Sequence, residues 1–574
     1  MILVFGGTTE GRKAVEVLEE GGSPYFYSTK TGEQDITLHH GQRIDGALDE
    51  EAMRAFCQAQ DIRLIVDAAH PFASQLHQTI AQVSEALNIP AIRFERIYPE
   101  RDPEITWIDD YSQIPRDIHS LLATTGVQSI SRLKPLEAEG IRIYYRILQR
   151  ESSIALALKQ GASPEQLCYY EDPQDIPVEA ETILLKESGL SGGFPEKVEA
   201  AKSRGMRIIA LKRPETLAFF TIVNGPYGLR RMVEKLLPEF YPLHSGLTTG
   251  TCATAAAVAA ALRLLKKEKP EEVPVLLPDG ETIYVPVSYS EEYASVFKDA
   301  GDDPDVTNGL EIRASVKPSE TFEILGGEGV GRFTLPGFDY PPGEAAINKA
   351  PREMIRQNLE SYGVPLQVTI SVPEGAEIAR RTFNPRLGIE GGISIIGVSG
   401  IVKPFSEEAF IESIRKCMTV AKASGSERVV INSGGKSERF VRALYPTLPQ
   451  QAFVEYGNYI GETLKIAHEL NIKKVTLGVM LGKAVKLAQG HLDTHSRKAT
   501  MDKDFIYTML REAGIETDIS DITLARELWE KIPKEKTQDF VRVVISHCET
   551  FCKPLLPEGT LTTLLIDDEG TIYS

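Results

Sequence analysis

Residues 2–12 read ILVFGGTTEGR, a run of four apolar residues that leads into a glycine-rich turn and then into a helical pattern. The helical pattern covers residues 10–20 and stops at two glycines, and a second apolar run follows at residues 25–28. A strand, a helix and a strand in this order predict a βαβ unit with parallel strands. The glycine-rich turn would lie at the N-terminus of the helix, where backbone N–H groups and the helix dipole favour a phosphate.

The same alternation continues beyond this unit. Asp49 would cap a second helix, and a strand follows at residues 64–68. A third helix continues through Val83, and another strand lies at residues 91–94. This pattern predicts a mostly parallel sheet covered on both faces, so we expect residues 1–100 to form a Rossmann-like α/β nucleotide-binding lobe. Further apolar runs lie at residues 141–147, 182–185 and 207–211. They predict a second α/β lobe over residues 101–240.

The pattern of residues along the sequence changes near residue 243. Pro238 and Pro242 bracket a linker, and residues 245–267 then read as a capped, alanine-rich helix. The remaining chain mixes a hairpin, marked by Asp279-Gly280, with long helical patterns instead of alternating regularly. We therefore predict an α+β domain over residues 243–574.

The composition is that of a globular protein, with 42% hydrophobic and 25% charged residues in a chain of 574. A chain of this length is too long to fold around one hydrophobic core, so several folding units are expected. The net charge of −18, without a basic half, argues against nucleic acid as a partner. No apolar run approaches the length of a membrane span, and the spacing of the six cysteines disfavours disulfides and structural zinc. We expect a cytoplasmic protein that acts on small molecules.

The first turn departs from the GxGxxG fingerprint, because Thr8 stands at its middle position between Gly6 and Gly11. The second strand ends in Ser28-Thr29-Lys30, where an acidic residue would bind the ribose 2′-hydroxyl of NADH. Hydroxyls and a lysine suit a 2′-phosphate, so the sequence favours NADPH and leaves NADH as the alternative. The expected nucleotide-binding residues are Gly6, Gly7, Thr8, Thr9, Glu10, Gly11, Arg12, Ser28, Thr29 and Lys30.

His70 lies in the sequence DAAHPFA, residues 67–73, directly after the third predicted strand. It would emerge at the carboxyl end of the sheet, where open α/β sheets bind ligands, although a hydrogen-bonded structural histidine is the alternative. These motifs, with RFER at 93–96, TTG at 124–126 and KESG at 186–189, resemble the ordered motif set of the precorrin-6A reductase family over about residues 1–240.

The resemblance implies two α/β lobes, with a nicotinamide nucleotide on the first and a corrin macrocycle in the cleft. It further implies hydride delivery to a carbon–carbon double bond of the macrocycle, with His70 as a candidate catalytic proton donor. The substrate contacts that it implies are Arg93, Arg96, Thr124, Thr125, Gly126, Lys186, Ser188, Gly192, Gly193 and Lys197.

A hydroxyl-rich stretch, SGLTTGTCAT at residues 245–254, opens the alanine-rich helix. It suits an anionic group such as a propionate, or it serves only as a helix cap. Two glycine-rich turns, which contain Gly397 with Gly400 and Ser433-Gly434-Gly435, could hold the carboxylate or ribose of S-adenosylmethionine on backbone amides. The acidic run at 299–305 lacks the register of a calcium loop, and His491, Asp493 and His495 lack an HExxH pattern. No metal site is expected.

About ten ordered motifs over residues 243–574 are similar to those of the cobalt-precorrin-5B (C1)-methyltransferase family, among them KDAGDDPDVTNG at 298–309, GVSGIVKPFSEEA at 397–409 and EYGNYIGE at 455–462. The resemblance implies methyl transfer from S-adenosylmethionine on a fold of neither the Rossmann nor the tetrapyrrole-methylase type. The expected substrate contacts are Ser245, Thr248, Thr249, Gly250, Thr251, Asp299, Lys403, His495 and Arg497.

The two resemblances describe successive steps of anaerobic cobalamin biosynthesis. Methylation of cobalt-precorrin-5B at C1 yields cobalt-precorrin-6A, which the reductase converts to cobalt-precorrin-6B. The sequence therefore predicts a bifunctional enzyme that uses S-adenosylmethionine and NADPH or NADH, with cobalt carried by the substrate and other enzymes of the pathway as possible partners. The alternatives are a tetrapyrrole-binding protein with one active half, and a different reductase fused to an unrelated transferase.

Overall fold

The computed structural model describes residues 1–30, 35–172 and 174–574. The chain divides into two compact units, the first made of residues 1–245 with 274–284 and the second of residues 246–273 with 285–574. Each unit is described by itself. No helix in the described ranges has both the length and the apolar character needed to cross a membrane.

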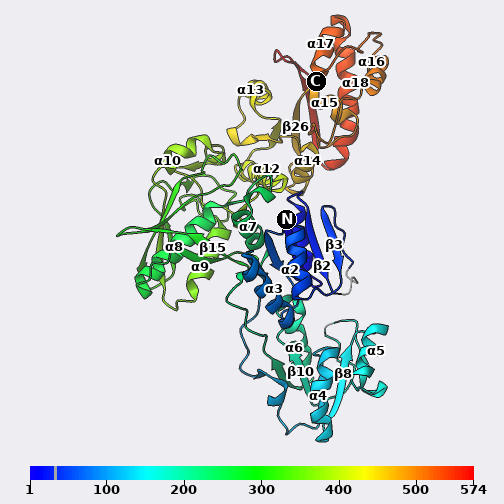
Figure 1. Cartoon of the computed structure of the whole chain (residues 1–574). Coiled ribbons are helices and arrows are strands. Elements are labelled where there is room, and N and C mark those ends of the chain that lie inside the picture. Colours follow the sequence, from blue (N-terminus) through cyan, green and yellow to red (C-terminus); the bar gives the residue numbers. More distant parts are fainter. Residues whose placement is uncertain (31–34, 173) are drawn as a thin grey trace. The chain divides into compact units, whose positions relative to one another are not determined.

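The first lobe of unit 1 is a six-stranded parallel sheet in the order β12-β5-β4-β1-β2-β3 (Figure 1). Its strands are β1 (Ile2–Phe5), β2 (Tyr25–Thr29), β3 (Gly41–Asp45), β4 (Leu64–Asp67), β5 (Ala91–Phe94) and β12 (Thr221–Val223). Its helices are α1 (Thr9–Glu19), α2 (Glu50–Ala59), α3 (Ser74–Leu87) and α7 (Pro226–Leu236).

The side chains of β1 alternate between two cores, which explains why all four of its residues are apolar. Ile2 and Val4 pack with buried residues of α1 and α7, whereas Leu3 and Phe5 pack with buried residues of α2 and α3. Because both faces of a parallel sheet are covered by helices, its central strands read as continuous apolar runs. The sheet therefore follows directly from the βαβ rhythm of the sequence.

The second lobe of unit 1 is another six-stranded parallel sheet, in the order β6-β11-β10-β7-β8-β9. Its strands are β6 (Thr106–Ile108), β7 (Ser120–Ala123), β8 (Arg142–Ile147), β9 (Leu167–Tyr169), β10 (Thr182–Lys186) and β11 (Arg207–Leu211). Its helices are α4 (Ile130–Ala138), α5 (Glu151–Lys159) and α6 (Phe194–Ser203). The chain leaves the first lobe after β5 and returns to it as β12, so two connections join the lobes. The prediction that residues 101–240 form the second lobe is therefore wrong at its C-terminal end, because β12 and α7 pack into the first lobe.

The N-terminal half of unit 2 is built around helix α8 (Thr249–Lys266) and a mixed five-stranded sheet, β16-β17-β18-β21-β19. The strands are β16 (Ser288–Tyr289), β17 (Ala294–Phe297), β18 (Glu311–Pro318), β19 (Glu323–Gly326) and β21 (Leu366–Ser371), and α9 (Lys349–Glu360) also packs on α8. The alanines of α8 are buried around its whole circumference. Small side chains allow this helix to lie close to several neighbours at once.

A hairpin of β14 (Glu272–Leu276) and β15 (Thr282–Pro286) forms at the predicted Asp279-Gly280 turn. Its tip belongs to unit 1, where the Glu281 carboxylate accepts hydrogen bonds from the backbone N–H groups of Tyr227 at 3.2 Å and Gly228 at 2.9 Å. These donors lie in the first turn of α7, whose N–H groups have no partner within the helix. Unit 1 thus includes a segment beyond residue 245, and the predicted linker is itself part of this unit, because Phe240 and Tyr241 are buried in the core of the first lobe.

The C-terminal half of unit 2 differs from the α+β prediction. Strands β25 (Phe453–Glu455), β24 (Arg428–Asn432), β26 (Lys474–Met480) and β27 (Thr560–Ile566) are parallel, and only β28 (Ile572–Tyr573) is antiparallel. The principal helices are α12 (Glu407–Ala423), α13 (Gly435–Leu444), α14 (Ile460–Glu469), α15 (Leu481–Ala488), α16 (Lys503–Glu512) and α18 (Thr537–Cys552). This half is therefore an α/β layer structure. The sequence obscured it because a long, largely helical stretch separates β26 from β27.

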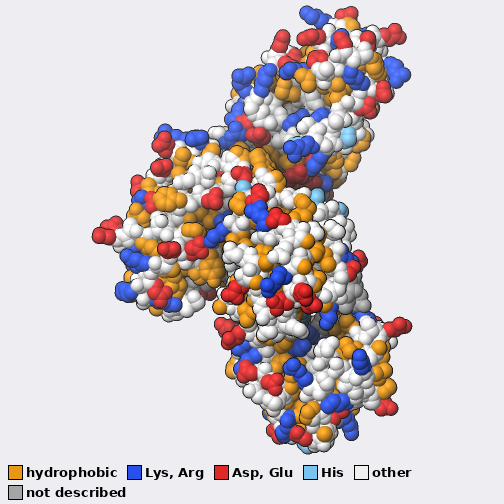
Figure 2. All heavy atoms as spheres, viewed as in Figure 1, with side chains coloured by type: hydrophobic (Ala, Val, Ile, Leu, Met, Phe, Trp, Pro, Cys, Tyr) orange, Lys and Arg blue, Asp and Glu red, His pale blue; other side chains and the backbone are white. Residues whose placement is uncertain are grey.

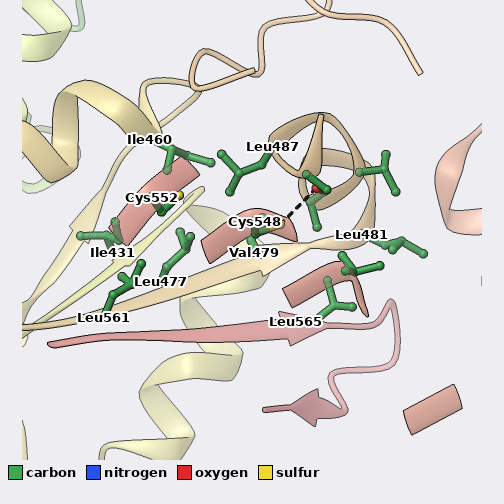
Figure 3. Packing of buried hydrophobic residues seen from close by; sticks show 14 of the residues in the cluster. Ile431, Ile460, Leu477, Val479, Leu481, Leu487, Cys548, Cys552, Leu561 and Leu565 are labelled. Atoms are coloured by element: carbon green, nitrogen blue, oxygen red, sulfur yellow. Dashed lines mark hydrogen bonds between the residues drawn. The ribbon is translucent and has the colours of Figure 1, made fainter. Parts of the chain in front are cut away.

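The core of this sheet contains two of the cysteines (Figure 3). Cys548 and Cys552, one turn apart on α18, pack among Leu477, Val479 and other apolar side chains, and the Cys548 thiol donates to the backbone oxygen of Ala484 at 3.3 Å. Burial raises the pKa of both thiols. All six cysteines are free, and this pair acts as small core residues.

Candidate functional site

The turn after β1 is shaped by a tyrosine that the sequence analysis did not identify. Tyr27, on β2, is fully buried, and its hydroxyl accepts a hydrogen bond from the Gly7 N–H at 3.0 Å. A Cβ atom on Gly6 would lie 2.1 Å from this hydroxyl, whereas a Cβ on Gly7 would meet no atom within 4 Å. Gly7 has a φ of +91°, which favours glycine. Tyr27 therefore requires the first glycine, and the backbone conformation requires the second.

Thr8 fixes the start of α1 and connects two strand ends. Its side chain accepts from the Gly11 N–H at 3.1 Å and donates to the Ala68 carbonyl, beyond the end of β4, at 2.7 Å. β1 and β4 are neighbours whose connections run to opposite sides of the sheet, so their carboxyl ends form its topological switch point. Ligands of open α/β sheets bind at such points.

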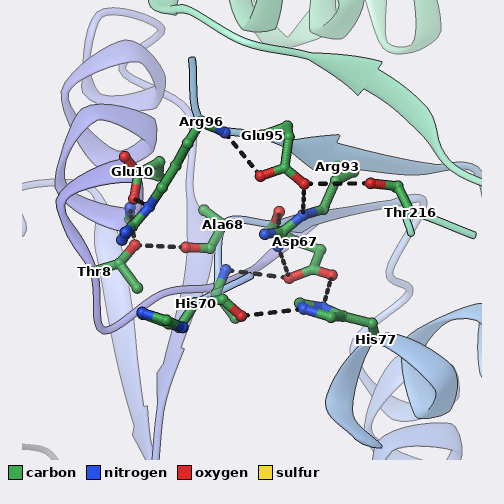
Figure 4. Close-up of polar contacts among 12 residues, drawn as sticks. Thr8, Glu10, Asp67, Ala68, His70, His77, Arg93, Glu95, Arg96 and Thr216 are labelled. Carbon is green, nitrogen blue, oxygen red and sulfur yellow. Dashed lines mark hydrogen bonds and ion pairs between the residues drawn. The ribbon is translucent and has the colours of Figure 1, made fainter. Parts of the chain in front are cut away.

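A buried charge network lies below the end of β4 (Figure 4). The Asp67 carboxylate is inaccessible to solvent. It forms ion pairs with the Arg93 guanidinium at 2.9 Å and with His77 Nδ1 at 2.6 Å. His77 Nε2 lies 3.1 Å from the His70 carbonyl oxygen, and Arg93 also pairs with Glu95 at 3.3 Å. Burial alone would raise the pKa of Asp67. The hydrogen bond from His77 and the charge of Arg93 outweigh burial, so the pKa of Asp67 is lowered. The network fixes the backbone on which His70 sits.

The His70 ring points away from His77 and lines the cleft (Figure 4). Its Nδ1 accepts from the Phe72 N–H at 3.2 Å, which leaves Nε2 to carry the proton in the neutral ring. Burial, reinforced by Arg96 and Lys186, lowers the pKa of His70 to about 3. The ring is therefore neutral at physiological pH.

Arg96 joins the two lobes of unit 1. Its Nε pairs with Glu10 on α1 at 2.8 Å, and its Nη1 donates to the Ser188 carbonyl of the second lobe at 2.8 Å. Ser191 also donates to Glu10. Glu10 is buried and satisfied by these contacts, so its carboxylate is directed at the second lobe.

The second sheet has its own switch point, between β7 and β10. The Thr124 hydroxyl donates to the Leu184 carbonyl at 3.0 Å, Thr125 lies 2.6 Å from Ser129, and Gly126 has a φ of +85°. The Lys186 ammonium lies 4.9 Å from the Phe72 ring centre. Thr124, Thr125 and Gly126 are thus mainly engaged in forming the turn, whereas Lys186 reaches the cleft.

The turn after β10 is also internally bonded. The Ser188 hydroxyl donates to the Gly192 carbonyl at 3.1 Å, and Lys197 donates to the same carbonyl at 2.8 Å. Burial, followed by the charges of Arg146 and Arg96, lowers the pKa of Lys197 to about 8. Gly193 adopts a left-handed conformation at the start of α6.

A large cleft of about 2230 Å³ opens where the strand ends of the two lobes meet. Of the residues expected in the reductase site, it is lined by Gly6, Gly7, Thr8, Thr9, Arg12, Ser28, Thr29, Lys30, His70, Arg96 and Lys186. Those that lie outside its lining are Glu10, Gly11, Arg93, Thr124, Thr125, Gly126, Ser188, Gly192, Gly193 and Lys197.

The lining of the cleft has a small excess of basic over acidic side chains, because Asp35, Asp49, Glu50, Asp109, Asp110 and Glu215 line it as well. Eight lysine and arginine side chains line it, and within the described ranges Arg12, Arg132 and Lys186 form no ion pair. On the molecular face seen in Figure 2, acidic and basic side chains are interspersed. Arg132 lies on α4 and carries no motif, so the sequence analysis missed it.

The hydroxyl cluster at the start of α8 in unit 2 is buried and internally bonded. Thr251 donates to the Gly400 carbonyl at 2.6 Å, the Thr249 hydroxyl accepts from the Ile396 N–H at 2.8 Å, and the Gly250 N–H donates to the Ile396 carbonyl at 2.9 Å. Thr248 caps the helix, and a Cβ on Gly397 would lie 2.3 Å from its hydroxyl. The cluster thus holds the loop that contains Gly397 and Gly400 against α8.

The other expected substrate contacts of the methyltransferase do not form one hydrogen-bonded cluster within the described residues. Ser245, at the end of unit 1, donates to Glu234, and Asp299 accepts from the Gly301 N–H at 2.9 Å. His495 Nδ1 accepts from the Arg497 N–H at 3.2 Å. Lys403 lies directly after β23 (Ile401–Val402).

The Ser433-Gly434-Gly435 turn lies at a third switch point, between β24 and β26. The Asn432 side chain accepts from the Gly434 N–H at 2.8 Å, and Ser437 bonds to the Ser433 N–H at 3.1 Å. Gly434 and Gly435 have φ values of +85° and +52°. The turn leads from β24 into α13, so it occupies the same place in its βαβ unit as the turn after β1.

Comparisons with known proteins divide the chain in the same way. The family described as "Precorrin-6x reductase CbiJ/CobK" matches residues 1–226, and the family CbiD matches residues 238–404. The cobalt-precorrin-5B C(1)-methyltransferase of Prosthecochloris aestuarii is 44% identical over 345 residues, 56% of this chain and 94% of that protein. The corresponding protein of a Geobacillus species is 42% identical over 323 residues, 53% of this chain and 88% of that protein.

Two solved structures also match. The CbiD protein of Archaeoglobus fulgidus is 32% identical, with 48% of this chain and 85% of that chain covered and a TM-score of 0.26. A CobK precorrin-6A reductase is 17% identical, with coverages of 41% and 96% and a TM-score of 0.33.

The chain is a fusion of two enzyme families of cobalamin biosynthesis. Its C-terminal part belongs to the cobalt-precorrin-5B C(1)-methyltransferase family, and its N-terminal part belongs to the precorrin-6x reductase family.

Proposed function

We propose that this chain methylates cobalt-precorrin-5B at C1 with S-adenosylmethionine and then reduces the resulting cobalt-precorrin-6A with a nicotinamide nucleotide. The observation that carries the proposal is the co-occurrence of the two families on one chain, because the product of the first reaction is the substrate of the second. The large cleft in unit 1 supports it, since a corrin precursor is a large polycarboxylate and Arg132 and Lys186 line the cleft without an ion pair to the described residues.

The first lobe of unit 1 is proposed to be Rossmann-like and to bind the nucleotide. Its strand order corresponds to that of doubly wound dinucleotide-binding sheets, and its glycine turn leaves open space at Gly7. Thr29 and Lys30 line the cleft beside Arg12, and cations and hydroxyls suit a 2′-phosphate. We therefore favour NADPH over NADH.

Reduction adds a hydride and a proton across one carbon–carbon double bond. The nucleotide supplies the hydride when bound, and the protein must hold the macrocycle beside it and place a proton donor at the adjacent carbon. Lys186 and Arg132, which form no ion pair with the described residues, are placed to bind substrate carboxylates, and His70 presents Nε2–H to the same cleft. Substrate carboxylates near His70 would favour its charged form, which couples proton delivery to substrate binding.

Methyl transfer requires in-line approach of a nucleophilic carbon to the sulfonium and exclusion of water. No protein nucleophile is needed, so the residues of unit 2 mainly bind and align the two ligands. The turn at Ser433-Gly434-Gly435 is the proposed cofactor site, because it lies at a switch point and opens a helix. The loop that contains Gly397 and Gly400 has less support, since its neighbouring hydroxyls bond within the protein.

The test is a coupled reaction with purified protein and cobalt-precorrin-5B. With S-adenosylmethionine alone, mass spectrometry should detect the gain of one methylene unit, and addition of NADPH should then give the gain of two hydrogens. Methylation without reduction, or binding without either step, would instead favour a protein with one active half or a tetrapyrrole carrier.

A further inference from the structure

The carboxylate of Glu455 occupies a distinctive position in unit 2. Glu455 is the last residue of β25 and is paired in register with Asn432, the last residue of β24. β24, the glycine turn, α13 and β25 form a parallel βαβ unit that begins at the switch point. Glu455 follows Gly434 by about 20 residues, the spacing at which dinucleotide-binding βαβ units place the acidic residue that binds ribose hydroxyls.

The glycine turn and this carboxylate fit together sterically. A Cβ atom on Gly434 would lie 2.2 Å from Glu455 Oε1, so the absence of a side chain at Gly434 leaves the space that the carboxylate occupies. Gly435, the next residue, has open space where its Cβ would be. The site therefore combines an exposed backbone turn at a helix start with a carboxylate beside it.

The Glu455 carboxylate has no hydrogen bond or ion pair to the described parts of the chain. Its charged neighbours behave differently: Glu438 is paired with Arg386 at 2.9 Å and with Arg442 at 2.9 Å, and the Lys483 ammonium donates to the Gly457 carbonyl. These same groups, Arg386, Glu438 and Lys483, are the charges that act on Glu455. A partly buried carboxylate without a partner costs stability and is typical of a group reserved for a ligand.

We infer that Glu455 binds the two ribose hydroxyls of the adenosyl group of S-adenosylmethionine, with the turn at Gly434-Gly435 beneath the nucleoside. This assignment rests on the proposed methyltransferase function and adds to it a residue that recognises the ribose. Two adjacent hydroxyls donate to the two oxygens of one carboxylate, which accepts but does not donate hydrogen bonds when ionised. The equivalent strand end in the first lobe of unit 1 carries Ser28-Thr29-Lys30, which suits a 2′-phosphate instead.

The test is calorimetric titration of the full chain with S-adenosylhomocysteine and with its 2′-deoxy analogue, for the wild type and for Glu455→Gln. Loss of charge-assisted hydrogen bonds should weaken binding of S-adenosylhomocysteine roughly tenfold or more. The 2′-deoxy analogue should bind the wild type weakly already and lose much less in the variant. Glu462→Gln, on the surface of the next helix, is the matched control and should bind as the wild type does.

Unchanged affinity of Glu455→Gln, or equal losses for both ligands, would overturn the assignment while leaving the methyltransferase proposal standing. A wild-type protein that binds no S-adenosylhomocysteine and transfers no methyl group would overturn both. Thermal melting of the variant distinguishes a lost contact from lost folding, because the amide of glutamine has nearly the same size as the carboxylate.

Discussion

His70 shows how the environment of a single residue sets its chemistry. The sequence predicts a histidine at a strand end facing a ligand, and the structure places it there with Nε2–H toward the cleft. Burial and the nearby cations hold the ring neutral, so it cannot act as an imidazolium donor until an anionic substrate arrives. The lowered pKa also makes the stability of unit 1 depend on pH.

We predict that His70→Gln makes unit 1 more resistant to acid. The unfolded chain binds a proton at His70 near pH 6.5 and the folded chain only near pH 3, so the wild type loses stability as pH falls between these values. The loss is about 1.4 kcal/mol per pH unit below 6.5. Urea unfolding at pH 7.5 and 5.5 measures it, and His119→Gln, whose side chain is 93% exposed, is the control. Equal pH dependence of His70→Gln and wild type would contradict the buried neutral ring.

Lys30 decides the nucleotide preference in our proposal. Lys30→Asp should weaken NADPH binding roughly tenfold or more, because an attractive contact to the 2′-phosphate becomes repulsive, and should change NADH binding little. Fluorescence titration with both nucleotides measures the ratio. Lys13→Asp introduces the same charge change on the exposed side of α1, outside the cleft. A ratio that stays at the wild-type value in Lys30→Asp would remove Lys30 from the site.

At the scale of elements, each proposed nucleotide turn is shaped by a side chain from the neighbouring strand. Tyr27 on β2 occupies the space beside Gly6, and Glu455 on β25 occupies the space beside Gly434. The two turns therefore need glycine for contacts that lie about 20 residues away in the sequence. A motif search finds the glycines, but only the paired strands explain them.

Gly6→Ala tests this packing in the first lobe. The added methyl would overlap the Tyr27 ring, which is fully buried and cannot move aside, so unit 1 should lose about 1–3 kcal/mol. NADPH affinity should fall with it, because the turn must shift. Gly22→Ala is the comparison, since its Cβ meets no atom and its cost is limited to a left-handed φ. Denaturant unfolding that shows Gly6→Ala to be no worse than Gly22→Ala would refute the role of Tyr27.

At the scale of the whole chain, each reaction is assigned to its own unit with its own ligands. Unit 1 contains the cleft and both reductase lobes, and unit 2 contains the glycine turn with Glu455. We expect the chemistry of the two sites to be separable, even though the hairpin segment at 274–284 is part of unit 1 and follows it in the sequence.

Gly7→Val should therefore abolish reduction and leave methylation intact. A φ of +91° is unfavourable for a β-branched residue, and the side chain would project into the space that the pyrophosphate needs. With both cofactors supplied, cobalt-precorrin-6A should accumulate, as followed by mass spectrometry. Gly434→Val is the reciprocal variant and should stop methylation alone. If Gly7→Val blocks methylation in a folded protein, the reactions are not independent.

The sequence by itself determined the family of each part, the βαβ order of residues 1–100 and the glycine turns after β1 and β24. These features are local, since apolar periodicity and turn residues act over a few positions. It did not reveal that Arg93 is committed to Asp67 and Glu95, nor that the hydroxyls at Thr248, Thr249 and Thr251 bond within the protein.

Only the tertiary structure decided which motif residues line the cleft and which bond within the protein. Strand order brings Ala68 to Thr8 and Glu455 to Gly434, and it makes residues 428–566 a largely parallel sheet where the sequence indicated an α+β domain. The physical reason is that a buried polar group must be satisfied, and its partner comes from whichever strand or helix packs beside it. That neighbour is set by the long-range pairing of strands, which residue types along the chain do not encode locally.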